Sequence, residues 1–375
     1  MAYHGLTWDH PRGYRALEAA SARAGGLIAW DRQPLEGFEA HPIADLCARY
    51  DLVVLDHPHV GEAFAAGCLR PLETLFTDAE IAAFRREAIG PSLTSYRYGG
   101  QHWALPLDAA SQVMAYRADL LDGDLPETWA EVLALRKPVA LSLAGPHAAL
   151  TLWSIATAFG DPPALADPER LFAGDAALAA LDVMADLAGR MPAGLRALNP
   201  IGLLGAMATG EEVALCPLVY GYLNYAAPVD PAAMPLRFAD APRCAKGGRP
   251  GSTLGGTGIA VSTRADVSLD LLDHLRWLMG TEAQTRFIPD HSGQPSRRAA
   301  WRDARVNRDW NGFYAATETT LERAYVRPRH DGAIAFQTEA AELIRAGLET
   351  RREYAAIRDD LQAAYAASRQ PGAER

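Results

Sequence analysis

The chain has 375 residues, about two to two and a half times the length of a typical domain, so two domains or lobes are expected. Its 49% apolar and 22% charged residues exclude a disordered, collagen-like or small disulfide-rich protein. Acidic residues outnumber basic ones by 46 to 36, and the net charge of −10 argues against nucleic acid and anionic lipid as partners. The chain has no run of 18 apolar residues that would cross a membrane.

The first sixty residues alternate between strand-like and helix-like segments. Strands are expected over 3–7, 27–30 and 52–55, and helices over 14–24 and 43–50. Before the first helix, Asp9 and His10 place a polar cap next to Pro11. A β-α-β-α-β run predicts a parallel sheet with right-handed crossovers.

A second α/β unit is expected after Pro106. Its predicted strands are 112–116, 139–143 and 213–218, and its predicted helices are 129–135, which Thr128 caps, 148–159, 176–190 and 201–209. Residues 243–258 lack periodicity and are rich in glycine and basic residues, which indicates a crossing loop. A strand over 259–262 and helices over 271–280 and 335–348 complete the α/β pattern.

The four cysteines are Cys47, Cys68, Cys216 and Cys244. They show no CxxC spacing and lie mostly in apolar stretches, so we interpret them as packed thiols, with one disulfide as the alternative.

Two Asp-His-Pro triplets follow two nearby strands of the first predicted sheet. Ligands bind at the carboxyl ends of strands in open α/β sheets, where helix N-termini offer free amide donors. One interpretation is that Asp9 and Asp56 only cap the following helices. The other is that Trp8, Arg12 and His59 join them in a cationic and aromatic cluster for a polar or anionic ligand.

A metal site is a further reading of His10, His57 and His59 with the two aspartates. Two histidines on either side of one proline are not a recognised ligand spacing, so hydrogen bonding to a ligand is favoured over metal binding, and purely structural roles are an equal alternative. Phosphate-loop, dinucleotide, HExxH and GxSxG motifs are all missing from the sequence. Residues 255–258 read as a backbone crossing where side chains do not fit.

An ordered set of short motifs resembles the family 1 extracellular solute-binding proteins, the ligand receptors of ABC importers in the maltose-binding-protein superfamily. The motifs are YDLVVLD (50–56), VGE (60–62), GCLRPL (67–72), GQHWALPLD (100–108), YRADLL (116–121), PETW (126–129), GGTGIAVS (255–262), LRWL (275–278), GQPSR (293–297) and RP (327–328). Each motif alone is weak, but their order spans nearly the whole chain.

The resemblance implies a two-lobed periplasmic-binding-protein-like fold, each lobe a mixed or parallel sheet flanked by helices, that closes on a ligand by a hinge motion. The N-terminal lobe would contain residues 1–108 and 259–300, and the C-terminal lobe residues 109–258 and 301–375. The crossovers, and hence the hinges, would lie near 108–112 and 254–258.

The family also implies which residues face the ligand. Carried over by position, they are Trp8, Asp9, His10, Arg12, Asp56, His57, His59, Asp108, Ser111, Gln112, Gly145, His147, Tyr220, Tyr222, Asn224, Thr253, Gly255, Gly256 and Thr257. Trp8, Tyr220 and Tyr222 would stack on sugar rings, although core packing is the alternative for each. Many sugar-binding members have an aromatic residue where this chain has Thr257, which favours a smaller or more polar ligand.

The implied function is a monomeric receptor that captures a sugar, polyol or sugar acid without a cofactor and delivers it to ABC permease subunits. Residues 1–5 lack the basic and apolar regions of an export leader, so a periplasmic or extracellular location is expected from the family alone. The alternative is a cytoplasmic enzyme or ligand sensor on the same fold, with Asp9, His10, Asp56, His57 and His59 as acid and base groups.

Overall fold

Two units, each built around its own sheet, make up the chain in the computed structural model, which describes residues 2–34, 41–121 and 123–369. The first unit comprises residues 1–110, 255–306 and 329–334, and the second comprises 111–254, 307–328 and 335–375. The expected crossovers near 108–112 and 254–258 each contain one of these boundaries. Residues 301–306 and 329–334 belong to the first unit, whereas the sequence assigned them to the C-terminal lobe. The assignment of functional lobes stays a prediction.

The first unit contains a five-stranded sheet of order β2-β1-β3-β11-β6. Its strands are β1 (Tyr3–Trp8), β2 (Ile28–Gln33), β3 (Leu52–Asp56), β6 (Leu105–Pro106) and β11 (Thr257–Val261), and β4 (Arg97–Tyr98) pairs separately with β5 (Gln101–His102). Strands β1, β2 and β3 are parallel, as predicted, whereas β11 runs antiparallel to both β3 and β6. The sheet is therefore mixed.

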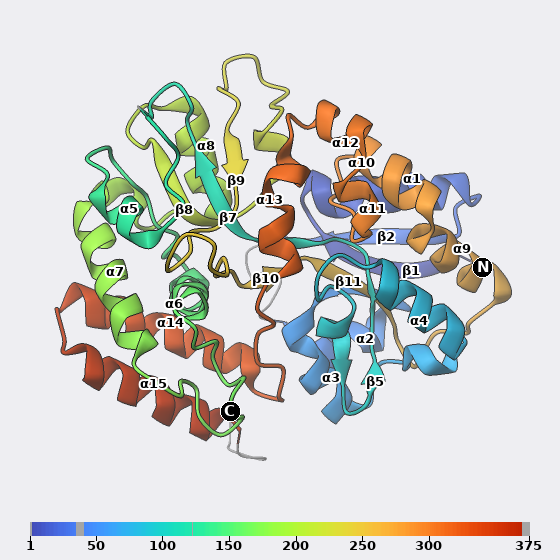
Figure 1. The fold of residues 1–375 in the computed structure, drawn as a ribbon. Helices are drawn as coiled ribbons and strands as arrows, with labels where there is room; N and C mark the ends of the chain where they lie inside the picture. The colour runs from blue at the N-terminus through green and yellow to red at the C-terminus, as the bar shows by residue number, and fades with distance from the viewer. Residues whose placement is uncertain (1, 35–40, 122, 370–375) are drawn as a thin grey trace. The chain divides into compact units, whose positions relative to one another are not determined.

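Helices flank this sheet on both sides (Figure 1). They are α1 (Pro11–Arg23), α2 (Ile43–Arg49), α3 (Val60–Ala66), α4 (Asp78–Glu87), α9 (Leu269–Met279), α10 (Ile288–Asp290) and α11 (Arg298–Trp301), with 3-10 turns at η1 (His57–His59), η2 (Leu72–Thr74) and η3 (Thr94–Tyr96) and a π-helical segment at η6 (Ala283–Phe287). Helix α12 (Ala304–Asp309) begins in this unit and ends in the second. Alternate residues of the strands face α2 and α3, where Val53, Leu55 and Ala260 pack with Leu46 and Val60 in one core cluster.

The sheet of the second unit is antiparallel around β7 (Ala110–Tyr116), which pairs with both β8 (Leu215–Tyr220) and β9 (Arg237–Ala239). Short β10 (Leu254–Gly255) lies on its other side in the order β10-β7-β8. The helices are α5 (Trp129–Ala134), α6 (His147–Ala158), α7 (Ala176–Arg190), α8 (Pro200–Thr209), α13 (Phe313–Glu322), α14 (Ala333–Glu349) and α15 (Tyr354–Ser368), with turns at η4 (Ala193–Leu195) and η5 (Leu223–Tyr225).

Helix α6, seen nearly end-on in Figure 1, is buried from Ala148 to Ala158. Trp153 of this helix stacks on Phe336 of α14 with ring centroids 6.0 Å apart. A helix that is apolar on every side needs neighbours all round, which explains why α7 and α14 both pack against it.

The predicted strand over residues 139–143 is wrong. Val139 forms only an isolated bridge with Leu215, where β8 begins, and Ala140 N donates to Leu215 O at 2.9 Å. The Ser142 carbonyl instead accepts a hydrogen bond from Thr151 Oγ1 of α6 at 2.9 Å. Backbone groups that bind a helix side chain cannot continue a strand ladder, so pairing stops after one bridge.

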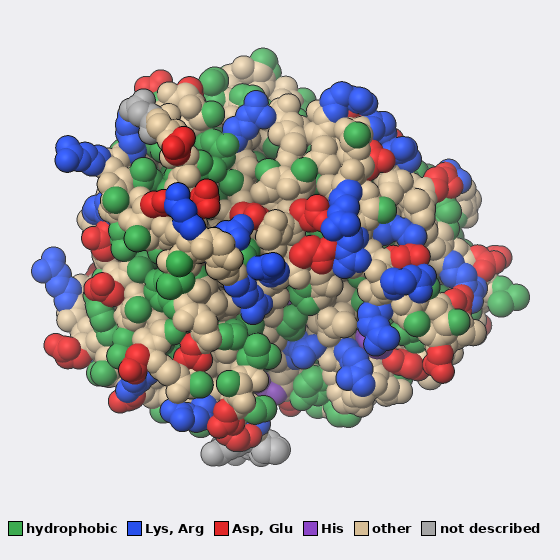
Figure 2. All heavy atoms as spheres, in the orientation of Figure 1, with side chains coloured by type: hydrophobic (Ala, Val, Ile, Leu, Met, Phe, Trp, Pro, Cys, Tyr) green, Lys and Arg blue, Asp and Glu red, His purple; other side chains and the backbone are tan. Residues whose placement is uncertain are grey.

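Three of the four cysteines fit the expected packing. Cys47 and Cys216 are buried and Cys68 is half-buried, whereas Cys244 is exposed and is not a packed thiol; all four are reduced. None of the described helices has the length and apolar composition of a membrane-spanning segment. Acidic and basic side chains are interspersed on the face shown in Figure 2.

Candidate ligand-binding site

The first site loop joins β1 to α1. His10 is the N-cap of α1, with extended backbone (φ −148°, ψ 143°), and its Nδ1 accepts a hydrogen bond from Arg12 N at 3.2 Å. Asp9 lies one residue too early to cap the helix; it is exposed, with Oδ1 3.6 Å from Nη1 of Arg32. The expectation that Asp9 caps this helix is therefore wrong, and His10 does so instead.

Arg12 and Asp108 form a buried ion pair within the first unit. Arg12 Nε donates to Asp108 Oδ2 at 2.8 Å, and Nη2 donates to Oδ1, so the pairing is bidentate. The two side chains are 5% and 6% exposed. The guanidinium charge is thus matched by a carboxylate of the protein itself, which weakens its preference for an anionic ligand.

The backbone around Asp108 is held by the crossing segment at 255–257. Asp108 N donates to Thr257 O at 2.9 Å, and Thr257 N donates to Asp108 O at 3.1 Å. Gly256, which directly precedes Thr257, has φ +88°, and a Cβ on it would lie 2.3 Å from Asp108 O. Glycine is needed for both reasons, as expected for a close backbone crossing. Thr257 is 5% exposed, and its Oγ1 has no hydrogen-bond partner.

Trp8 is packed in the interior of its unit, at 3% exposure. Its indole stacks on the His10 ring, with centroids 5.2 Å apart, and a Cβ on Gly13 would lie 2.5 Å from it. Burial and the neighbouring Arg12 lower the pKa of His10 to about 4, so this imidazole is neutral at pH 7. His10 therefore acts as a hydrogen-bonding group rather than a cation.

The second site loop follows β3. Asp56 is half-buried and faces Thr257 in the β3–β11 register. His57 is fully buried and meets Tyr96 edge-on at 6.3 Å, whereas His59 Nδ1 lies 3.6 Å from Glu62 Oε2. His57 and His59, two of the residues proposed as acid and base groups, thus contact different neighbours.

A metal site does not appear in the described parts of the chain: no three His, Cys, Asp or Glu side chains there lie close enough to share an ion. His10 instead stacks on Trp8, and His59 lies beside the carboxylate of Glu62.

In the second unit, Gln112 lies in a buried polar network. Its Oε1 accepts a hydrogen bond from Ser154 Oγ at 2.5 Å, and its carbonyl accepts one from Ser252 Oγ at 2.6 Å. Ser154 Oγ also accepts from Thr253 N at 2.8 Å, while Thr253 Oγ1 donates to Leu150 O at 3.1 Å. Gln112 has 0% exposure and its Nε2 has no partner, so an amide donor is left unused at a fixed position.

Aromatic groups lie beside this network. Tyr220 faces Gln112 in the β7–β8 register, donates to Leu254 O at 3.3 Å and is half-buried. His147, the first residue of α6, meets Tyr220 edge-on at 5.8 Å. The two rings and Gln112 therefore gather at one end of β7.

The remaining predicted residues of this unit lie near the ends of β8 and α6. Tyr222 is 8% exposed and precedes η5, where Asn224 has a buried Oδ1 without a partner. Ser111 is buried, and its carbonyl accepts from Gly221 N at 3.3 Å. Gly145, with φ +53°, precedes α6, and its carbonyl accepts a hydrogen bond from Arg345 Nη1.

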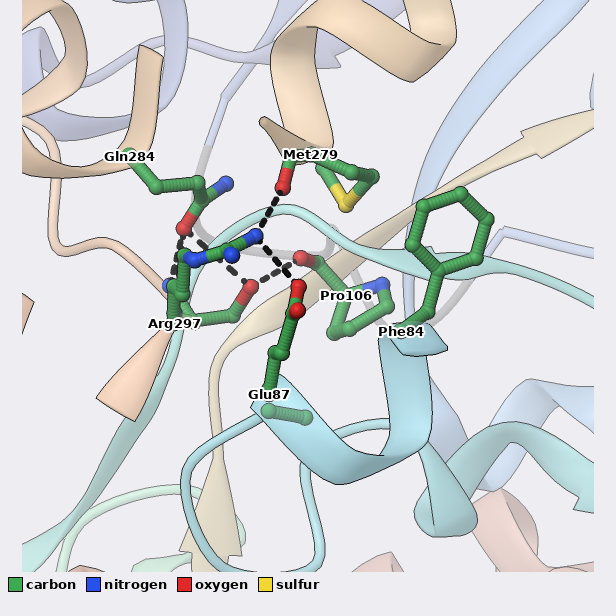
Figure 3. A pocket seen from close by; sticks show the side chains of 8 residues that line it. Phe84, Glu87, Pro106, Met279, Gln284 and Arg297 are labelled. Atoms are coloured by element: carbon green, nitrogen blue, oxygen red, sulfur yellow. Dashed lines mark hydrogen bonds and ion pairs between the residues drawn. The ribbon is translucent and has the colours of Figure 1, made fainter. Parts of the chain in front are cut away.

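A small hollow in the first unit, shown in Figure 3, is lined by residues that include Glu87, Pro106, Gln284 and Arg297. Its volume of about 10 Å³ fits a single water molecule. Arg297 Nη1 lies 2.6 Å from Glu87 Oε2 and donates to the Met279 carbonyl at 3.0 Å, while Gln284 Oε1 accepts from Arg297 N at 3.1 Å. Nearby, Gln294 Nε2 donates to Ala109 O at 3.2 Å. Because the polar groups that line this hollow are bonded to one another, we interpret it as part of the scaffold rather than as a ligand site.

Ser154 and Ser252 were not predicted as site residues, although their hydroxyl groups form hydrogen bonds with Gln112 and Thr253. Ser154 lies between Trp153 and Ile155 in a helix that reads as uniformly apolar. A small hydroxyl on a fully buried helix face was the available signal, because such a group must bond to something inside the protein.

The comparisons with known proteins agree with this fold. Residues 43–314 match the family model described as "Bacterial extracellular solute-binding protein". No curated protein matches the chain in sequence.

Three solved structures illustrate the likeness. An ABC transporter solute-binding protein from Agrobacterium radiobacter K84, in complex with ribitol, has a TM-score of 0.79 at 20% identity over 98% of each chain. The cyclic alpha-maltosyl-1,6-maltose binding protein from Arthrobacter globiformis has a TM-score of 0.79 at 18% identity over 99% of each chain. Maltose-bound MalE3 of T. maritima has 0.77 at 16%, covering 97% of this chain and 98% of its own. The predicted two-lobed fold class is thus confirmed.

Proposed function

Because the chain belongs to the bacterial extracellular solute-binding proteins, we propose that it binds a small polyhydroxylated solute and delivers it to an ABC importer. Of three proteins with the same fold, one is in complex with ribitol, one is maltose-bound and one is a cyclic alpha-maltosyl-1,6-maltose binding protein, which supports a sugar or polyol as the ligand class. We also propose that the protein is periplasmic and monomeric, and that its partners are ABC permease subunits.

The observation that supports it most is a set of neutral hydrogen-bonding atoms that are buried without a partner at the predicted site. Gln112 Nε2 is a donor, Asn224 Oδ1 an acceptor, and Thr257 Oγ1 either one. Buried polar groups in native proteins are nearly always hydrogen-bonded, so these three atoms, two in the second unit and one in the first, are candidates for partners that a ligand supplies. Hydroxyl groups, which both donate and accept, suit all three.

The charges of the site favour a neutral ligand over an acidic one. The Arg12 guanidinium is already bound bidentately by Asp108, and His10 is neutral because its pKa is lowered to about 4. Of the sugar, polyol and sugar acid expected from the sequence, the first two fit these charges better. Of the predicted stacking residues, half-buried Tyr220 is better placed to stack on a pyranose than Trp8, whose indole is covered by α1.

A thermal-shift screen tests the ligand class. Ribitol, mannitol, monosaccharides and maltose form one arm, and amino acids and polyamines form the other. A ligand at 100 times its Kd adds about 2.7 kcal/mol to the stability of the folded state, which gives a measurable rise in Tm. The proposal requires a shift from at least one sugar or polyol. Stabilisation by amino acids or polyamines alone would reject it.

A catalytic function is not proposed, since no observation favours one. The family is one of transport receptors, and Asp9 and His59 contact Arg32 and Glu62 rather than each other.

A further inference from the structure

Two cysteines from different parts of the chain meet at the core of the first unit. Cys47 of α2 is 3% exposed and belongs to the core cluster, and half-buried Cys68, just after α3, packs against that cluster. Each thiol is the largest cause of the shifted pKa of the other, so the two sulfur atoms are neighbours in this core. We propose that Cys47 and Cys68 are an intramolecular disulfide site, closed when this protein meets an oxidised thiol compound.

The backbone holds both cysteines in place for this bond. Gly67 ends α3 in the left-handed conformation (φ +60°), and Cys68 N donates to Ala63 O at 3.3 Å. Thr263 N binds the Cys68 carbonyl at 2.9 Å. A disulfide forms without strain only where the two cysteines are already neighbours, and the packing of both in one core cluster brings them together.

Helix α2, which carries Cys47, is bonded to α3, the helix that precedes Cys68. Ile43 N, at the start of α2, donates to Glu62 Oε1 of α3 at 3.0 Å. Both helices also pack on the same sheet face through Leu46 and Val60. The position of Cys47 is therefore set by the element that positions Cys68.

The two thiols differ in a way that sets the order of reaction. The interaction with Cys47 lowers the pKa of Cys68, whereas the interaction with Cys68, together with burial, raises the pKa of Cys47. Cys68 is also the more exposed of the two. Since the thiolate is the nucleophile, Cys68 reacts first and Cys47 second.

With oxidised glutathione the reaction balances as two exchanges. The Cys68 thiolate attacks one glutathione sulfur, the glutathione disulfide breaks, and one glutathione thiolate leaves. Cys47 then passes its proton to a thiolate and attacks Cys68 Sγ, which releases the second glutathione. The protein dithiol has been oxidised by two electrons, and one glutathione disulfide has been reduced to two thiols.

The other two cysteines serve as built-in controls. Burial raises the pKa of Cys216 to about 12, so it stays an inert thiol. Cys244 is exposed and lies in the second unit, so it can take up glutathione but has no resolving thiol there other than buried Cys216.

The test is mass spectrometry of the native protein after incubation with oxidised glutathione. We expect loss of two hydrogens with a peptide cross-link between Cys47 and Cys68, also in the Cys244→Ser variant. Closing a loop of about 20 residues should raise Tm by about 5 °C or more, and dithiothreitol should reverse it. In Cys47→Ser, a glutathione adduct should persist on Cys68, and in Cys68→Ser, Cys47 should stay unmodified.

Two results would overturn the proposal. One is a native protein in which both thiols remain free at equilibrium; the other is a stable glutathione adduct on Cys68 with Cys47 still present. None of these readouts involves a transported solute, so they are independent of the proposed transport function.

Discussion

At the scale of single residues, Arg12 and Asp108 show how a charged group becomes part of the scaffold. Their bidentate pair is almost fully buried in one unit. Removing one partner leaves a buried charge uncompensated, which costs about 3–5 kcal/mol. We therefore expect Asp108→Asn to lower the free energy of unfolding by about 3 kcal/mol in urea titrations.

The matched control for that prediction is Asp186→Asn. Asp186 lies 2.7 Å from Arg190, but these side chains are 52% and 37% exposed. An exposed pair contributes about 0–1 kcal/mol, so this variant should be nearly neutral. Equal losses from both substitutions would show that the Arg12–Asp108 pair is not buried in solution.

His10 makes a prediction about pH. Its pKa is 6.5 in the unfolded chain and about 4 in the fold, where burial and Arg12 disfavour the charged form. Between pH 6.5 and 4 the unfolded state binds more protons, so stability is full above pH 6.5 and is lost as the pH falls toward 4. His10→Asn keeps a capping acceptor but cannot titrate.

Urea midpoints at pH 7 and pH 4.5 measure this effect. The wild-type protein should lose more stability than His10→Asn between the two conditions. Identical losses in the two proteins would place His10 in solvent.

Among the secondary-structure elements, α3 packs so closely against segment 329–334 that only glycine fits at the contact, which the sequence alone does not reveal. A Cβ on Gly61 would lie 1.9 Å from the Arg329 carbonyl oxygen. Gly61→Ala should therefore force the segment away from α3 and destabilise the protein by more than about 2 kcal/mol, as overpacking does.

Gly189→Ala is the control for this substitution. Gly189 lies in α7, and its Cβ would meet nothing within 4 Å. Alanine is the better helix former, so this variant should gain about 0.5–1 kcal/mol. A Gly61→Ala protein as stable as the wild type in thermal unfolding would contradict the close packing of segment 329–334.

Most elements of the fold were predictable because their signals are local. The helix at Trp129 begins after Thr128, whose side chain forms a capping box with Glu131, and the long amphipathic helix appears as α14. Residues 139–143 were predicted wrongly because the competing bonds come from Thr151 of another element. A polar cap before Pro11 was predicted, but which of Asp9 and His10 provides it depends on which side chain reaches the Arg12 N–H.

The candidate site was predictable only as a set of positions. Family motifs led to Gln112 and Thr257, but the unmatched Nε2 and Oγ1 atoms depend on which neighbours reach them in three dimensions. Likewise, nothing in the sequence pairs Arg12 with Asp108, which are 96 residues apart.

At the scale of the whole molecule, the family implies closure on the ligand. Small-angle scattering of the purified protein should show a smaller radius of gyration when a tight ligand is added. An unchanged profile at saturating ligand would contradict a hinge mechanism while leaving binding intact.

Isothermal titration calorimetry shows whether the chain is a receptor for a small polyhydroxylated solute. The sugar or polyol with the largest thermal shift should bind saturably, one molecule per chain. Thr257→Val removes only the buried hydroxyl and should weaken binding about tenfold, in line with about 1–1.5 kcal/mol for one hydrogen bond, whereas exposed Thr74→Val should not. If no sugar or polyol gave a heat of binding, while an amino acid or polyamine bound saturably, the proposed ligand class would be contradicted.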